Sequence, residues 1–176
     1  MVDASTMLGN LITSFPGLVT LVNLLASLAG LAIVFIGIYK FTELKPKGDQ
    51  RLVTAIMWVF SGVALINLAS SIETGLVTVF GSSANVHSLM AYSSTSGMSQ
   101  ASQQLIQVLI MCARLYGLVA AIRGIMTLRH VGDPGYREGN AFKSGLMKFV
   151  FGCILLNIVQ AVSVVATTFG WGQPLG

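Results

Sequence analysis

Charged residues are scarce in this chain of 176 residues. They make up 9% of it, against roughly 25% in an ordinary soluble domain, while hydrophobic residues make up 54%. So few charges cannot cover the surface of an 18.6 kDa globule, which argues against a soluble enzyme. The mean hydropathy of +0.79 also excludes a disordered chain, because disorder requires low hydrophobicity and high charge. The lipid bilayer is therefore the expected solvent.

Sequence motifs for catalysis and metal binding are also missing. The chain contains no phosphate-binding loop, no HExxH, no nucleophile elbow and no cysteines at metal-ligand spacing. Its two cysteines, Cys112 and Cys153, lie in apolar stretches, which is typical of small core residues. We therefore predict no enzyme activity, no catalytic cofactor and no metal site.

Four apolar segments are long enough to cross a hydrocarbon core as helices, which takes roughly 20 residues each. They cover residues 17–39, 52–72, 104–126 and 145–169. The runs are continuous rather than alternating, and they are about twice as long as a barrel strand. We therefore predict an all-α integral membrane protein with four transmembrane helices. Residues 1–16 lack the basic start of a signal peptide and are expected to form a short amphipathic segment, which Pro16-Gly17 ends.

The sparse positive charge gathers in two connections between these segments. Nine of the ten basic residues lie in, or within a turn or two of, the loops 40–51 and 127–144. The Ser-rich connection 82–103 and the tail 171–176 contain no lysine or arginine. The positive-inside rule therefore places both basic loops in the cytoplasm, and both termini on the other side of the membrane.

Basic residues are also the candidates for facing lipid or an aqueous lumen. These candidates are Lys40, Lys45, Lys47, Arg51, Arg114, Arg123, Arg129, Arg137 and Lys143. Arg114 differs from the others, because it lies roughly 20 Å from the cytoplasmic end of its helix at about 1.5 Å per residue. A charge at that depth costs at least about 2.5 kcal/mol, so it should face the protein interior, a lumen or a lipid phosphate. Its expected partners are Asn67, Asn157 and Gln160, with Glu73 less favoured.

The two halves of the sequence resemble each other. Gly30-Leu-Ala-Ile-Val-Phe-Ile-Gly-Ile38 aligns with Gly117-Leu-Val-Ala-Ala-Ile-Arg-Gly-Ile125, and Met57-x4-Gly62-x2-Leu65-x-Asn67 aligns with Met147-x4-Gly152-x2-Leu155-x-Asn157. We interpret residues 17–81 and 104–170 as a parallel, tandem repeat of a helical hairpin. This arrangement differs from the inverted repeat of many transporters. The alternative is chance similarity among apolar helices.

Small and amide residues inside the spans predict close helix packing, which drives association in lipid. The candidates for helix packing are Gly30, Gly37, Asn67, Gly117, Gly124 and Asn157. The two asparagines are expected to form hydrogen bonds between helices, with a pore-lining role second. The glycines suit packing within one chain and packing between subunits equally well.

A set of residues in the second half resembles a known family. The set is Leu105-Ile-Gln, Gly117-Leu, Arg123-Gly124, Leu128, His130, Pro134-Gly135, Gly139, Gly145-Leu146, Gly152 and Asn157. Through these residues the chain resembles the IcmC/DotE family of Dot/Icm type IVB secretion systems. Within that family it is most similar to the TraQ-type conjugal transfer proteins of IncI-like plasmids. This resemblance implies a small inner-membrane protein that is needed for conjugation or effector export, with other type IV secretion membrane proteins as partners. It implies no active site.

Each half is also similar to a two-helix conjugative pilin, which has a short basic loop and assembles with phospholipid into a hollow filament. We expect the chain to depart from such pilins in having two hairpins and in lacking a long cleaved leader. We therefore expect a pilin-like subunit that self-associates into a DNA-transfer pilus, with phospholipid as a structural ligand. Its basic loops would then meet lipid headgroups, or single-stranded DNA without reading its sequence. The alternatives are a non-polymerising component of the secretion channel and, less favoured, a small transporter or channel.

Overall fold

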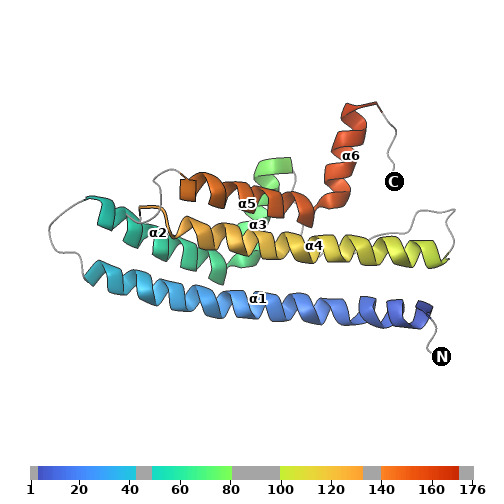
Figure 1. Cartoon of the computed structure of the whole chain (residues 1–176), viewed down its shortest axis with the longest axis horizontal. Coiled ribbons are helices and arrows are strands. Elements are labelled where there is room, and N and C mark those ends of the chain that lie inside the picture. Colours follow the sequence, from blue (N-terminus) through green and yellow to red (C-terminus); the bar gives the residue numbers. More distant parts are fainter. Residues whose placement is uncertain (1–3, 43–48, 81–99, 133–139, 171–176) are drawn as a thin grey trace.

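The computed structural model describes residues 4–42, 49–80, 100–132 and 140–170, and within these ranges every regular element is a helix (Figure 1). The helices are α1 (Ala4–Thr42), α2 (Asp49–Ile66), α3 (Leu68–Phe80), α4 (Gln100–Leu128), α5 (Asn140–Leu156) and α6 (Ile158–Thr168). The predicted all-α class is confirmed for this part of the chain. Residues 82–99 of the predicted Ser-rich connection 82–103 and the tail 171–176 lie outside it, whereas residues 100–103 belong to α4 and not to the connection.

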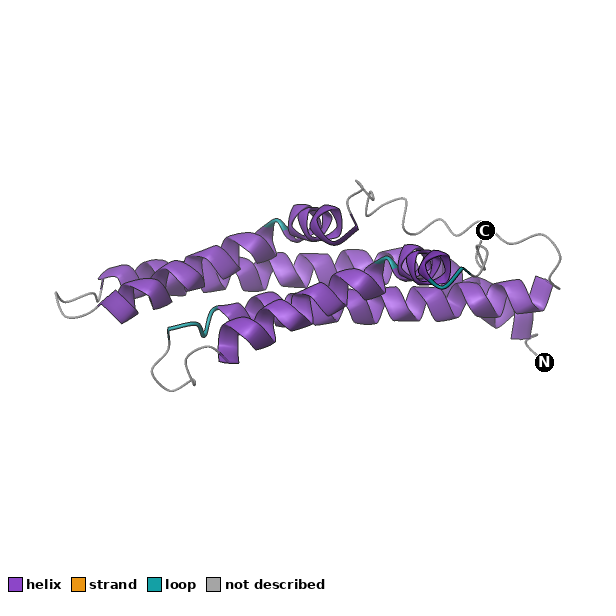
Figure 2. Cartoon of the chain, turned by 90° about the horizontal axis from the view of Figure 1, so that it is seen from above, coloured by secondary structure: helices purple, strands orange, loops and turns teal. Residues whose placement is uncertain are grey.

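Two long helices run side by side in the same direction, and a shorter helix returns along each of them. Figure 1 shows α1 and α4 lying parallel, with α2 folded back on α1 and α5 folded back on α4. Beyond these hairpins, α3 and α6 are two short arms that cross the direction of the bundle and are seen nearly end-on in Figure 2. The α3 arm packs on α5 and buries Leu68, Ile72 and Leu76 in the core. Each half of the chain therefore has a long helix, a returning helix and an arm.

The expectation of one continuous helix over 52–72, and of another over 145–169, is wrong. The axes of α2 and α3 differ by 96° at a break that contains Asn67, and α5 and α6 are separated at Asn157. In the described residues, two helices are long and apolar enough to cross a membrane, Gly9–Thr42 and Ser102–Leu128. The count rises to three if the bent α2–α3 pair forms one span.

Serine hydroxyls satisfy backbone carbonyls that the first break releases. Ser71 Oγ donates a hydrogen bond to the Ala64 carbonyl over 3.0 Å, and Ser27 Oγ of α1 donates to the Ile66 carbonyl over 3.4 Å. A break in an apolar helix is tolerated in lipid only where the released backbone groups find such partners. The bend at Asn67 is therefore supported from both α1 and α3.

The N-terminal segment also differs from the expectation, because α1 runs through Pro16 without a break. Proline at this point removes one backbone donor from the helix. The Thr20 hydroxyl donates to the Pro16 carbonyl over 3.0 Å, and the Thr13 hydroxyl donates to the Gly9 carbonyl over 2.9 Å. Residues 4–16 thus continue the first long helix and do not form a separate amphipathic segment.

Glycines allow the paired helices of each half to touch. A Cβ added at Gly30 would lie 2.7 Å from the Gly62 carbonyl oxygen, and one added at Gly117 would lie 2.8 Å from that of Gly152. The predicted packing positions Gly37 and Gly124 are equally tight, against Val59 and Phe149 respectively. These four glycines therefore lie at contacts within the chain, between α1 and α2 and between α4 and α5.

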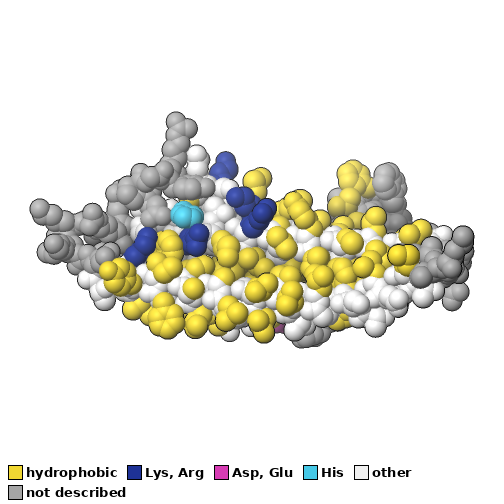
Figure 3. Space-filling view, turned by 60° about the horizontal axis from the view of Figure 1, so that its bottom comes forward, with side chains coloured by type: hydrophobic (Ala, Val, Ile, Leu, Met, Phe, Trp, Pro, Cys, Tyr) yellow, Lys and Arg dark blue, Asp and Glu magenta, His cyan; other side chains and the backbone are white. Residues whose placement is uncertain are grey.

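The two hairpins share one hydrophobic core. Its buried members come from both halves and include Leu65, Ile72, Leu118, Ala121 and Cys153. Cys153 is a small core residue, as predicted, whereas Cys112 is exposed on α4. Large apolar side chains also cover much of the outer surface, which suits contact with lipid or with other subunits (Figure 3).

Candidate functional site

Positively charged side chains meet around one indole ring at the end of the bundle where both hairpins turn. Lys40 Nζ, at the end of α1, lies 4.2 Å from the centroid of the Trp58 ring on α2. Arg129 is the first residue after α4, and its Cζ lies 5.0 Å from the same centroid. Both distances are within the range of cation–π attraction, which a partly desolvated site strengthens. We call Lys40, Trp58, Arg129 and His130 the Trp58 cluster.

His130 completes the Trp58 cluster. Its ring meets the indole edge-on, with centroids 6.3 Å apart and an angle of 77° between the planes. Arg129 Nε donates a hydrogen bond to His130 Nε2 over 3.2 Å, so the imidazole accepts at that nitrogen. The Trp58 cluster thus joins the end of α1, the middle of α2 and the segment after α4, and it concentrates cations at one end of the molecule (Figure 3).

The other predicted basic residues are spread along the same end. Arg123 and Lys143 are exposed on α4 and α5. Lys148, which was not among the candidates, donates from Nζ to the Thr127 hydroxyl over 3.4 Å and so links α5 to α4. Arg51 lies in the first turns of α2, and its side chain is outside the described part. Lys45, Lys47 and Arg137 lie outside the described residues.

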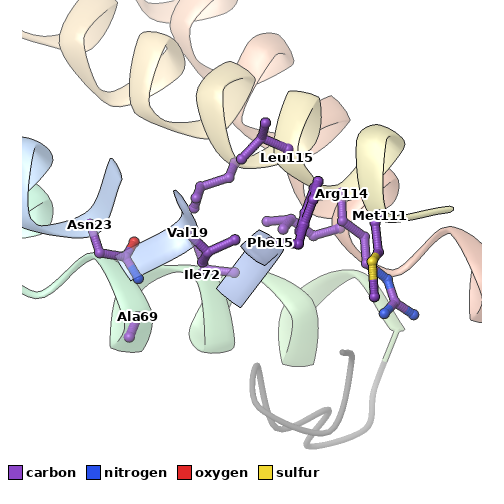
Figure 4. Close-up of a pocket in the computed structure, with 10 residues that line it drawn as sticks. Phe15, Val19, Asn23, Ala69, Ile72, Met111, Arg114 and Leu115 are labelled. Atoms are coloured by element: carbon purple, nitrogen blue, oxygen red, sulfur yellow. The ribbon is translucent and has the colours of Figure 1, made fainter. Parts of the chain in front are cut away.

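Arg114 lies apart from the other cations, in the middle of α4. It is only 8% exposed, and its Nε is buried without a hydrogen-bond partner. It lines a small cavity of about 40 Å³ with apolar side chains from α1, α3 and α4 (Figure 4). Figure 4 shows the guanidinium beside Met111 at one end of this cavity, with Asn23 at the other.

The partners predicted for Arg114 are not seen beside it. Asn67 is exposed at the bend between α2 and α3, and Glu73 forms no ion pair within the described residues. Asn157 is buried, at 3% exposed, and its backbone angles of φ −110° and ψ 45° lie outside the helical region. The side chain of Gln160 lies outside the described part. Arg114 is thus buried in the protein, which is one of the three surroundings expected for it, and within the described residues no carboxylate pairs with it.

A larger apolar groove lies on the side of the bundle where α3 departs. It has a volume of about 470 Å³, and residues of α2, α3, α4 and α5 line it. Thr74 and Thr78 line this groove from α3, but their hydroxyls donate to the backbone carbonyls four residues earlier. The groove therefore offers almost no free polar group and suits hydrocarbon better than a polar ligand.

The Trp58 cluster can attract anions, whereas the cavity and the groove offer mainly apolar packing surfaces. Among the described residues, no group of three or more His, Cys, Asp or Glu side chains is arranged to hold a metal ion. Sequence reasoning missed Trp58, because an aromatic residue near a membrane boundary is ordinary. The signal that points to it is its place on α2, two helical turns after Arg51, the last residue of the first basic loop. Comparison of the chain with known protein families, curated proteins and solved structures gave no match.

Proposed function

We propose that this chain is a structural subunit of a conjugative type IVB secretion apparatus, a pilin-like protein that assembles into the DNA-transfer pilus. The observation that carries the proposal is the twofold occurrence of one unit: a long apolar helix, a returning helix held by glycines, and an arm. The chain is thus a pair of pilin-like hairpins in tandem. Polymerisation of such units provides a filament wall without any catalytic group.

Matching contacts support the duplication of the hairpin. Gly30 faces Gly62 in the first half, and Gly117 faces Gly152 in the second. The returning helix is interrupted at an asparagine in both halves, at Asn67 and at Asn157. These residues occupy aligned positions of the sequence repeat, so the two halves correspond in contacts as well as in sequence.

The Trp58 cluster supports the orientation in the bacterial inner membrane. Because the cations lie where both hairpins turn, we infer from the positive-inside rule that this end faces the cytoplasm and that both termini face the outer side. We infer that each returning helix and its arm together form a broken span, which gives four crossings. In an assembled filament, the cations at this end would bind phospholipid headgroups or single-stranded DNA through phosphate.

Analysis of filaments tests the proposal. Pili sheared from donor cells should contain this chain as a major protein, together with phospholipid phosphorus, by mass spectrometry and negative-stain microscopy. A donor that lacks the coding sequence should yield no such filaments. Sheared pili without the chain would refute the proposal. A fixed ratio to other secretion proteins, with no extracellular pool, would support the alternative of a non-polymerising component of the secretion channel.

A small transporter or channel is the second candidate. The observation that favours it is the interruption of helices at matching positions of two repeats, because broken spans form the binding sites of many transporters. This function requires solute flux through liposomes that Arg114→Ala or Asn157→Ala reduces. The apolar lining of the cavity beside Arg114 makes it the weaker candidate.

A further inference from the structure

Positions that the sequence alignment pairs between the two hairpins differ in their exposure. On the long helices, Leu31 pairs with Leu118 and Ile38 pairs with Ile125. Leu118 and Ile125 are buried members of the core that both hairpins share. Leu31 and Ile38, by contrast, are 50% and 51% exposed. The first hairpin therefore leaves open, on α1, the positions that the second hairpin buries on α4.

The returning helices show the same difference. Cys153 and Leu156 of α5 are buried in the shared core. The residues of α2 that pair with them, Val63 and Ile66, are exposed and apolar. The first hairpin thus has an open apolar surface that corresponds to the surface by which the second hairpin binds it. We call this surface the α1–α2 face, and its residues are Leu31, Ile38, Val63 and Ile66.

The second hairpin is open on the opposite surface. The arm of the first hairpin, α3, packs on α5, where a Cβ added at Gly75 would lie 2.8 Å from Cys153 Sγ. The other arm, α6, packs on α4 and α5 of its own hairpin, and Figure 1 shows it clear of the first hairpin. Counted from the paired asparagines, Val165 of α6 takes the position of Gly75, and it is exposed. On α4, Leu109 pairs with Val22, which packs on the core, yet Leu109 is 70% exposed.

These two open surfaces are the ones that a tandem repeat leaves at its ends. Repeated units stack through one pair of unlike faces, so the first and the last unit each keep one face uncovered. Lipid chains cover any apolar face, and they give no reason why the exposed positions of one hairpin pair with buried positions of the other. A second copy of the chain supplies the matching surface.

We propose that copies of this chain join to one another as the two hairpins join within one copy. In this contact, α6 of one copy packs on α2 of the next with Val165 near Val63, and α4 of the first copy packs on α1 of the next with Leu109 on its open side. The proposal rests on the duplication and the self-assembly proposed above. Since the two faces differ, the contact is head-to-tail and repeats from copy to copy.

Disulfide trapping in membranes tests the contact. Val63→Cys is placed in one tagged copy and Val165→Cys in a differently tagged copy, both with Cys112→Ser and Cys153→Ala, and the membranes are oxidised with copper phenanthroline. We expect a linked dimer that carries both tags. The positive control is Gly75→Cys with Cys153 retained, which should close a disulfide within one chain because its Cβ would lie 2.8 Å from Sγ.

The matched negative control replaces Val63→Cys by Ile36→Cys. Ile36 is 44% exposed, against 46% for Val63, but it pairs with Arg123, which is exposed as well. It lies next to Gly37, which contacts Val59 of α2 one turn before Val63, so the two cysteines lie at a similar level of the bundle. The Ile36 variant should give little product.

The double variant Val63→Cys/Val165→Cys measures the symmetry of the contact. A head-to-tail contact should link the copies into a ladder of dimers, trimers and larger species. Disulfides that join only like positions, 63 to 63 or 165 to 165, would overturn the proposal. Product no greater than that of the Ile36 control, in membranes where native gels still show oligomers, would also overturn it and leave self-assembly intact. Absence of any oligomer would instead refute the self-assembly on which the contact depends.

Alanine variants test the α1–α2 face without cysteines. Leu31→Ala combined with Ile38→Ala should weaken self-association by about tenfold or more, because truncation of a central contact commonly has an effect of this size. Their thermal unfolding as monomers in micelles should match that of the parent, since both side chains are open in one copy. Leu25→Ala, which is exposed and pairs with the exposed Cys112, is the control and should associate as the parent does. Energy transfer between labelled copies in lipid vesicles measures the association over a dilution series. If the Leu31/Ile38 variant associates as tightly as the parent, lipid covers this face and the proposed contact is wrong.

Discussion

Replacement of Gly152 by alanine is expected to destabilise the second hairpin by about 1–3 kcal/mol, the usual cost of an overpacked contact. A Cβ at this position would lie 2.6 Å from the Ala121 backbone nitrogen and 2.7 Å from the Gly117 carbonyl oxygen. Both of these are backbone atoms, which cannot rotate away as a flexible side chain can. The α4 and α5 backbones must therefore separate, and they lose packing along their length.

The direction of the stability change separates overpacking at the helix contact from the higher helix propensity of alanine. Alanine is favoured over glycine inside a helix by about 0.5–1 kcal/mol when nothing opposes it. Gly17 on α1 has no atom within 4 Å of the position of an added Cβ, so Gly17→Ala should be neutral or stabilising. Thermal unfolding of both variants in detergent micelles, followed by circular dichroism, should shift the midpoint down for Gly152→Ala only. Equal shifts in both variants would show that α4 and α5 do not touch at Gly152.

Truncation of Trp58 to alanine should have the second large effect, a loss of about 2–3 kcal/mol. A fully buried tryptophan costs about 3–5 kcal/mol on such truncation, and Trp58 is only half-buried. The ring also holds Lys40 and Arg129 through cation–π contacts. Without it, these two cations face each other across a gap, and the ends of α1 and α4 are no longer joined.

Two other aromatic substitutions provide controls for Trp58. The indole Nε1 is buried without a hydrogen-bond partner, so Trp58→Phe removes no bond and should keep most of the stability. Tyr116 lies on α4, and its side chain is 64% exposed and outside the core. Tyr116→Ala should therefore change the stability little. The midpoint of thermal unfolding in micelles measures all three variants. A Trp58→Phe variant as unstable as Trp58→Ala would mean that the indole N–H, rather than the ring, is essential.

The helices and their closest contacts were readable from the sequence because they depend on local pattern. Long apolar runs predict helices in lipid, and paired glycines such as Gly30 and Gly117 predict close approach. Burial of Arg114 follows from its depth in an apolar run. Each of these inferences uses neighbours in the sequence or the properties of the bilayer alone.

The interruptions of the returning helices were not readable in this way. No proline lies in residues 52–72 or 145–169, and the apolar character continues through Asn67 and Asn157. The first break depends on the hydroxyl of Ser27, which is 39 residues from the Ile66 carbonyl that it satisfies. Conversely, Pro16-Gly17 is an ordinary stop signal, yet α1 continues through it. A tertiary hydrogen bond supports the first outcome, whereas the only bonds beside Pro16 lie within α1.

The Trp58 cluster depended on tertiary structure as well. Lys40 lies near the end of α1, Trp58 in the middle of α2 and Arg129 just after α4, and only the packing of the two hairpins brings the two cations to one ring. The sequence predicted which cations share a side of the membrane, but it did not predict which of them meet.

The central claim of this account is that both hairpins turn on the same side of the membrane. Labelling of single cysteines with a membrane-impermeant maleimide tests it, in a background of Cys112→Ser and Cys153→Ala. Thr42→Cys and Lys143→Cys, at the turn ends of the two hairpins, should be protected in intact spheroplasts and labelled in inverted vesicles. Ala4→Cys, at the start of α1, should show the reverse. Labelling of Thr42→Cys and Lys143→Cys from opposite sides would contradict the parallel duplication.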